Sequence, residues 1–349
     1  MKTIKLLLTT IAVLLCSVMA NAYDFEVDGI RYDITSFTDL TVKASSLSET
    51  FVGDLVIPSK VQFSGKELAV TEVGDDFAVS NTSISSLMID DGLTAIGKSA
   101  FKDCSNITTV KIAETVDSIF IGEQSFMNCT NLTSINTAQT VLIIESETFR
   151  GCTALRTFNH SGNITMGSFS FADCTSLELV SIEKLDSLNN GTFMNCTKLS
   201  ECYLPNITII GDYAYKKCQS ISVYNIPNSV KIIGESAFES CTSLTSMIIP
   251  NNVTKLGLNA FNYCTSLTSV SIGAGLTYLP WIFNGCTNLS DIRIEDATRT
   301  LTFGYTGEYD PSVPASYDSE CYEMTASMFK GFNLKNVYIG RNITIEKYC

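Results

Sequence analysis

Cysteine is the residue whose number and spacing in this sequence most strongly suggest a chemical role. Nine cysteines recur at intervals of 22 to 25 residues, each three positions after an aromatic residue. A structural zinc site needs close pairs such as C-x-x-C, and the sequence has none. We therefore predict no metal and no cofactor, and a row of buried thiols that pack as small hydrophobic side chains. The nine are Cys104, Cys129, Cys152, Cys174, Cys196, Cys218, Cys241, Cys264 and Cys286.

Three further cysteines need separate interpretations. Cys321 and Cys349 lie outside the regular spacing. In an exported chain they could form a disulfide, and two free thiols are the alternative. Cys202 follows Leu199 by three residues, where another repeat has Val180, so we expect Cys202 to face the core.

Residues for catalysis are sparse. The single histidine, His160, has no nucleophile and acid at a spacing typical of a Ser/His/Asp site, and we expect it in a solvated turn. We predict no catalytic residue. A polysaccharide hydrolase remains a remote alternative, because the two carboxylates of a glycosidase have no fixed spacing. An insertion at residues 305–327 is the place where extra chain could surround such a pair.

A repeat of about 23 residues determines where these side chains lie. Ala237-Phe238-x-x-Cys241 returns as Ala260-Phe261-x-x-Cys264, and the apolar pattern between the phrases fits short extended pieces and a turn. We predict a β-rich α/β solenoid with one or two short strands plus a helical turn per repeat. Stacking at strand spacing would give a rod on the order of 50 Å long. The aromatic anchors are Phe77, Phe101, Phe126, Phe149, Phe171, Phe193, Tyr215, Phe238, Phe261, Phe283 and Phe329.

We divide the chain into five parts. Residues 1–22 are a predicted signal peptide, and residues 23–76 a predicted N-terminal β-hairpin cap, for which an independent binding module is the alternative. Residues 77–304 form the predicted solenoid. An insertion loop at 305–327 and a last repeat at 328–349 complete the chain.

The N-terminus predicts export. A basic start at Lys2 and Lys5 precedes a largely apolar run that ends near Ala20-Asn21-Ala22, so we expect cleavage after Ala22. The apolar run is shorter than the roughly 20 residues that a membrane span needs, and no other segment is long enough. We expect no transmembrane segment after cleavage, although Cys16 leaves a lipoprotein as a minor alternative.

The charge of the chain argues against nucleic acid as a partner. The formal net charge is −13, and loss of Lys2 and Lys5 would make it −15. Phosphate binding needs clustered lysine and arginine, which the sequence does not provide. With 45% hydrophobic and 17% charged residues, the chain is typical of a well-buried, ordered fold.

The strand positions that face outward are the candidate binding residues. They form a small, weakly polar stripe on which Tyr203 and Ile248 are large, and large apolar groups with a polar surround are typical of protein interfaces. A glycan-binding surface that uses exposed tyrosines is the alternative, and a face that only keeps the chain soluble is another. The candidates are Thr157, Asn159, Tyr203, Asn225 and Ile248 on the strands, with Tyr305 and Tyr309 on the insertion.

The repeat pattern L-x-x-V-x-I-(P)-x-x-V-x-x-I-G-x-x-A-F-x-x-C resembles the leucine-rich repeats of the BspA-like, or treponemal-type, family of bacterial surface proteins. The resemblance covers residues 77–345, and the segment at 23–73 is similar to what precedes such repeats. It implies a bacterial protein that is secreted or exposed on the cell surface, and the lack of a catalytic set of residues makes us expect a non-enzymatic one. The expected activity is adhesion or another form of binding to a host or bacterial surface protein.

Overall fold

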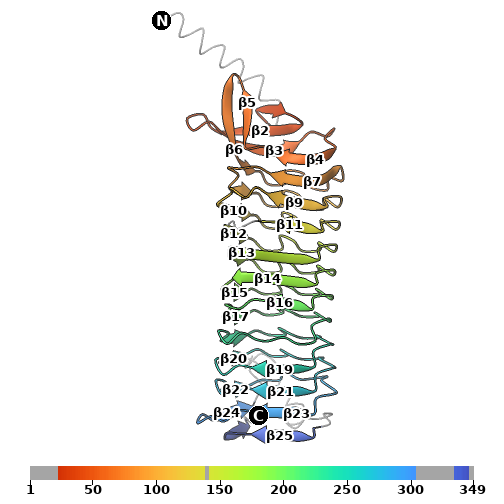
Figure 1. Cartoon of the computed structure of the whole chain (residues 1–349), viewed down its shortest axis with the longest axis vertical. Helices are drawn as coiled ribbons and strands as arrows, with labels where there is room; N and C mark the ends of the chain where they lie inside the picture. The colour runs from red at the N-terminus through yellow and green to blue at the C-terminus, as the bar shows by residue number, and fades with distance from the viewer. Residues whose placement is uncertain (1–22, 138–140, 304–333, 346–349) are drawn as a thin grey trace, which may run out of the picture.

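The computed structural model describes residues 23–137, 141–303 and 334–345. The repeats stack one above another into an elongated β-solenoid, with the N-terminal strands at one end and β25 (Asn336–Ile339) at the other (Figure 1). The described residues contain strands and turns but no helix. Accordingly, none of the described segments could cross a membrane as a helix.

The N-terminal end is built from three antiparallel strand pairs. β1 (Phe25–Val27) pairs antiparallel with β2 (Ile30–Ser36), and the two strands are joined at Asp28-Gly29, where both residues have positive φ. β2 pairs with β3 (Thr41–Leu47), and β5 (Lys60–Phe63) pairs antiparallel with β6 (Lys66–Val73). β3 and β6 are parallel, so the hairpin layer continues directly into the stacked repeats.

Each repeat has a leucine or isoleucine three residues after its cysteine, which we call the repeat leucine. The strand that follows it forms what we call the first ladder. Parallel pairing joins neighbouring repeats except at two interfaces, after β11 (Ser134–Asn136) and after β16 (Glu201–Tyr203), and residues on alternate positions face the core and the outside. The strands are β4 (Gly53–Ile57), β7 (Ile84–Ile89), β9 (Thr109–Ile112), β11 (Ser134–Asn136), β13 (Thr157–Met166), β14 (Leu179–Lys184), β16 (Glu201–Tyr203), β19 (Ser246–Ile249), β21 (Ser269–Ile272), β23 (Asp291–Ile294) and β25.

A shorter extended piece precedes each anchor aromatic and forms the second ladder. The long strand β13 takes part in both ladders, because its first half pairs with β14 and its second half with β12. The second ladder contains β6, β8 (Ala95–Ile96), β10 (Ser118–Ile121), β12 (Val141–Ile144), β15 (Ser187–Leu188), β17 (Ile209–Ile210), β18 (Ile232–Ile233), β20 (Lys255–Leu256), β22 (Tyr278–Leu279), β24 (Leu301–Phe303) and β26 (Ile343–Ile345).

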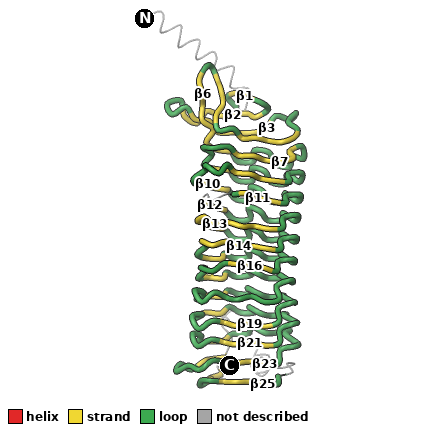
Figure 2. Tube along the Cα trace, in the orientation of Figure 1, coloured by secondary structure: helices red, strands yellow, loops and turns green. Residues whose placement is uncertain are grey.

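The predicted helical turn at the anchor aromatic is wrong, and backbone geometry explains why. In the repeat around Phe101, Ser99 and Asp103 have φ values of 52° and 60°, and two left-handed residues four apart cannot belong to a right-handed helix. The segment instead forms successive turns, such as Cys104 N–H to the Phe101 carbonyl at 3.2 Å. We call these segments, stacked along the column, the turn stack (Figure 2).

The left-handed residues direct amides along the solenoid axis. Ser99, Phe101 and Asp103 each donate their backbone N–H to the next repeat, at 2.7 to 2.9 Å. The same three positions donate in every repeat interface from Phe101 to Phe283, and in the repeat of Phe77 the donors lie one residue later, at Asp76, Ala78 and Ser80. In a helix these N–H groups would bond to carbonyls of the same helix. In the turn stack they bond to carbonyls of the next repeat instead.

The anchor aromatics stack on one another inside the turn stack. Phe101 and Phe126 lie 5.3 Å apart with an interplanar angle of 10°, and Phe126 and Phe149 lie 5.5 Å apart at the same angle. The anchors are fully or almost fully buried as far as Phe283. This column of rings forms one wall of a continuous apolar core.

The row of buried thiols is confirmed, and the thiols also form hydrogen bonds. Cys174 Sγ donates to the carbonyl oxygen of Phe149, one repeat earlier, at 3.1 Å. All nine are free and buried. Because desolvation penalises the thiolate, burial raises the pKa of Cys174 and of Cys241 from 9.0 to about 12. The same bond to the preceding repeat occurs at Cys104, Cys129, Cys152, Cys196, Cys218, Cys241, Cys264 and Cys286.

Glycine four residues before an anchor serves close approach between repeats. A Cβ placed on Gly257 would lie 2.3 Å from the backbone nitrogen of Glu235, which no side chain could tolerate. The φ of Gly257 is not in the left-handed region, so turn geometry is not the reason for this glycine.

The expectation of a solvated turn for His160 is wrong. The side chain is 3% exposed and lies in β13, where the burial pattern alternates without interruption. Its register partner is the core residue Ile182, and its Nδ1 lies 2.9 Å from Thr137 Oγ1. A polar pair thus occupies two neighbouring inward positions of the first ladder.

Candidate binding surface

Parallel register arranges the outward side chains of the first ladder in columns. Asn159 pairs with Ser181, and Ser181 pairs with Tyr203, so these three side chains follow one another along the axis. Thr157, Leu179 and Glu201 form a second column beside them. Ile248 lies in the next section of the ladder, in one column with Ser271 and Arg293.

Backbone pairing stops between β16 and the following repeat. No backbone hydrogen bond joins residues 200–205 to residues 222–227, although both segments are fully described. Residues 222–226 instead meet the repeat after them, through a single bridge between Val223 and Ser246.

Proline removes one backbone donor at this interruption. Where the ladder continues, the residue after the last inward position donates its N–H to the preceding repeat, as Gly273 does to Ile249 at 2.9 Å. The equivalent residues in three successive repeats are Pro205, Pro227 and Pro250, which have no N–H. The second ladder has a similar break: Pro280 has the place of Gly257, and β20 and β22 do not pair with each other.

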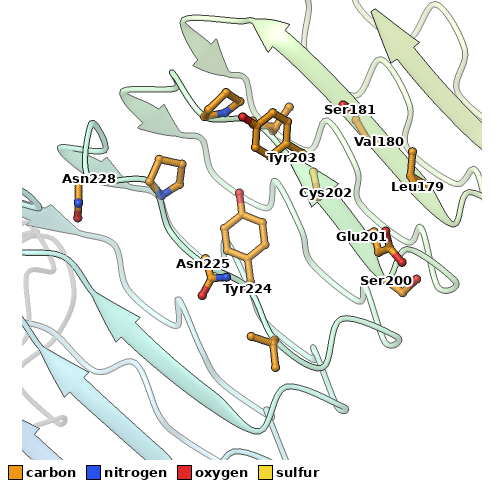
Figure 3. A pocket seen from close by; sticks show the side chains of 14 residues that line it. Leu179, Val180, Ser181, Ser200, Glu201, Cys202, Tyr203, Tyr224, Asn225 and Asn228 are labelled. Atoms are coloured by element: carbon orange, nitrogen blue, oxygen red, sulfur yellow. The ribbon is translucent and has the colours of Figure 1, made fainter.

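A groove of about 770 Å³ lies over the interruption (Figure 3). One side is formed by residues 200–205 and the other by residues 223–228. Tyr203, Glu201 and Asn225 contribute exposed side chains, and the ring of Tyr203 is 58% exposed. The groove therefore combines an accessible aromatic ring, a carboxylate and an amide.

The core beneath the groove contains an unusual polar cluster. Tyr215, the tyrosine among the stacked phenylalanines, places its hydroxyl 2.9 Å from Tyr224 Oη and 3.3 Å from Cys202 Sγ. Burial raises the pKa of both tyrosines above their ordinary value and raises that of Cys202 to about 12, so all three stay neutral. Cys202 faces the core, as expected, and is partly buried.

A second groove lies over β19, β21, β23 and β25. Ile248, 68% exposed, lies at one side, and Arg293 and Tyr338 lie at the other. The Arg293 guanidinium is 4.4 Å from the centre of the Tyr338 ring and makes two hydrogen bonds with Glu295, at 2.7 and 3.2 Å. These bonds lower the pKa of the Glu295 carboxyl and keep it charged.

The structure brings together two of the predicted site residues and separates the others. Tyr203 and Asn225 line one groove, whereas Ile248 lines the other. Thr157 and Asn159 are exposed on β13, outside both. The predicted residues Tyr305, Tyr309, Cys321 and Cys349 lie outside the described residues.

Sequence reasoning missed the feature that makes the first groove. Pro205, Pro227 and Pro250 stand at the same repeat position in consecutive repeats, and this pattern predicts lost ladder bonds.

Sequence reasoning also missed Arg341, whose guanidinium donates to the carbonyls of Gly273 and Leu276 at 2.9 and 2.6 Å.

The described residues contain no cluster of metal-ligating side chains. No group of three or more histidine, cysteine, aspartate or glutamate side chains there could hold a metal ion. The buried thiols do not converge, because each bonds a carbonyl of the preceding repeat.

Comparison with known families now places the chain. The sequence model of the BspA type leucine-rich repeat region, in six copies, matches residues 59–120, 119–209 and 208–309. The chain belongs to the BspA-type leucine-rich repeat family. Family members are repeat scaffolds, and the observed turn stack and ladders are the physical form of that repeat.

One solved structure shares the fold of this chain. A leucine-rich repeat protein from Bacteroides ovatus is 24% identical, with a TM-score of 0.65 over 93% of this chain and 90% of that one. A leucine-rich cell surface protein from Faecalibacterium prausnitzii is 21% identical, with a TM-score of 0.48 over 90% and 94%. No curated protein sequence matches this chain.

Proposed function

We propose that this chain is an exported, non-enzymatic repeat scaffold that binds a protein partner through the outer face of the first ladder, as in adhesion at a bacterial surface. The family supports a scaffold role, and the N-terminal sequence of residues 1–22 supports export. A host or bacterial surface protein is the partner class that a secreted or cell-surface scaffold would meet.

One observation carries the proposal of a protein interface. Tyr203, Val223 and Ile248 are 58%, 57% and 68% exposed on the same ladder, while their neighbours are small and polar. Large apolar side chains on an otherwise polar face lose water on binding and contribute much of the affinity of protein interfaces. A face that served only solubility would have no need of them.

A glycan-binding surface is the second candidate. The exposed ring of Tyr203 lies in one groove with Asn225 and Glu201, and aromatic rings with nearby amides and carboxylates suit sugars as well. At these two grooves a hydrolase has less support, because neither presents two facing carboxylates: Glu201 is the acidic side chain of one and Asp291 that of the other.

Site-specific photo-crosslinking tests the protein interface. Replacing Tyr203 or Ile248 with a benzophenone amino acid should give crosslinks to defined proteins from bacterial or host surface fractions, identified by mass spectrometry. The matched control is the same replacement at Lys255, which is exposed on the second ladder. Equal crosslinking from all three positions, or none, would contradict binding through the first ladder.

The export prediction has its own measurement. N-terminal sequencing of the protein recovered from outside the cytoplasm should begin at Tyr23, the residue after the expected cleavage site. A chain that retained residues 1–22 would contradict it.

A further inference from the structure

We infer that the groove over the interrupted ladder binds an arginine side chain presented by an extended segment of the partner protein. This inference rests on the proposed protein-binding function and names the chemistry of its partner. It is carried by the hydrogen-bonding character of the groove, by its one charged side chain and by two guanidinium sites elsewhere in the same molecule.

The backbone of the groove offers hydrogen-bond acceptors. Alternate residues of a parallel strand direct their carbonyls to opposite neighbours, and Glu201 N–H bonds the preceding repeat through Glu178. The carbonyls of Ser200, Cys202 and Leu204 consequently face the following repeat, to which no backbone bond is made. Pro227 cannot donate to Leu204, as its counterpart Gly273 donates to Ile249.

Charge and ring chemistry point the same way. Glu201 is the one charged residue among those that line the groove, and it is exposed there. Beside it, Tyr203 presents the face of a ring, which attracts cations. A guanidinium fits this set best, because its five N–H donors can reach a carboxylate and several carbonyls at once, whereas an ammonium is a single point charge.

The molecule already binds guanidinium groups in both of these ways. Arg341 donates to three backbone carbonyls, those of Gly273, Ala274 and Leu276, at 2.6 to 3.2 Å. Arg293 lies over a tyrosine ring and holds a carboxylate with two hydrogen bonds. The groove contains the same three kinds of partner, and a chain of net charge −13 favours a basic segment over an acidic one.

Ligand-observed NMR with small probes tests the inference. The probe is a capped glycine–serine–arginine–serine–glycine pentapeptide, and the matched probe carries citrulline, which is neutral and nearly the same shape. We expect the citrulline peptide, and the arginine peptide with a Glu201→Gln chain, to bind at least about fivefold more weakly. The control is Glu114→Gln, which changes an exposed carboxylate in a turn outside the groove and should leave binding unchanged.

Opposite results would overturn the inference. Equal binding of both peptides, or no effect of Glu201→Gln, would exclude a guanidinium site. Oligosaccharide binding that Tyr203→Ala abolishes, and that salt and Glu201→Gln leave unchanged, would assign the groove to a glycan instead. If the peptides fail while crosslinks from Ile248 persist, the protein-binding function stands and the arginine site falls.

Discussion

The turn stack and the first ladder run along the same repeats, yet one continues where the other is interrupted. In the turn stack, three amides bond across each repeat interface from Phe77 to Phe283. In the first ladder, pairing stops between β16 and residues 222–227, where Pro227 has no N–H to donate, and a groove opens there. The difference shows that the buried positions of the turn stack stabilise the column. The outward positions of the first ladder form a surface that differs from repeat to repeat.

The largest expected effect concerns the thiols of the turn stack. Their pKa values are raised by burial, to about 12 for Cys174, while thiols of the unfolded chain ionise near pH 9. The folded chain therefore holds protons that the unfolded chain loses, so stability is constant below about pH 8.5 and falls as pH rises toward 12. Each buried thiol costs about 1.4 kcal/mol per pH unit in this range.

Alkaline titration followed by circular dichroism and thiolate absorbance measures this effect. We expect cooperative unfolding between about pH 9 and pH 12, with thiolate appearing only as the chain unfolds. A Cys174→Ala chain should lose stability less steeply with pH. If thiolates form near pH 9 while the chain is still folded, the turn stack is open to solvent. It would then not be the more continuous of the two regions.

Removing one ring should be the next largest change. Phe126→Ala deletes a ring stacked on both Phe101 and Phe149, and we expect it to lower the free energy of unfolding by about 3–5 kcal/mol. Urea unfolding measures the loss. Tyr203→Ala, on the exposed ladder face, is the control and should change stability by no more than about 0.5 kcal/mol.

The polar cluster beneath the groove should show coupling of moderate size. Tyr215→Phe removes the hydroxyl that contacts Tyr224 and Cys202, leaving a buried hydroxyl without its partner, at a cost of about 1–2 kcal/mol. Adding Tyr224→Phe should restore part of that stability. A double-mutant cycle by urea unfolding tests this, and strictly additive effects would show that the hydroxyls do not interact.

The smallest effect on stability should come from restoring a ladder bond. Pro227→Ala supplies an N–H that can reach Leu204, and the gain is offset by the looser unfolded chain, so the net change should stay within about 1 kcal/mol. Hydrogen exchange should show a protected amide at position 227. The restored bond should narrow the groove, so the Pro227→Ala chain should bind the arginine peptide more weakly. A fast-exchanging amide at position 227 would disprove the role given to proline.

The buried architecture could be predicted from sequence because its residues repeat. The spacing of Phe238 and Phe261 gave the repeat, and the cysteine three residues later gave the buried thiols. The helical turn was mispredicted because left-handed φ values at residues such as Ser99 and Asp103 depend on bonds to the next repeat, which propensity does not include.

The candidate site could be predicted only in part. Alternation along the strands placed Tyr203 and Asn225 on the surface, but their meeting in one groove depends on ladder bonds lost in neighbouring repeats. His160 was misplaced for a related reason: its inward position follows from pairing with Ile182, not from its own polarity.

The interrupted pairing also has a mechanical consequence. Between β16 and residues 222–227 the column is held by the turn stack and by the second ladder, where β15, β17 and β18 pair without a gap. Resistance to bending is therefore lower at this level on one side of the rod only. A load that flexes the column concentrates its curvature there, so the mouth of the groove widens or narrows with the direction of pull.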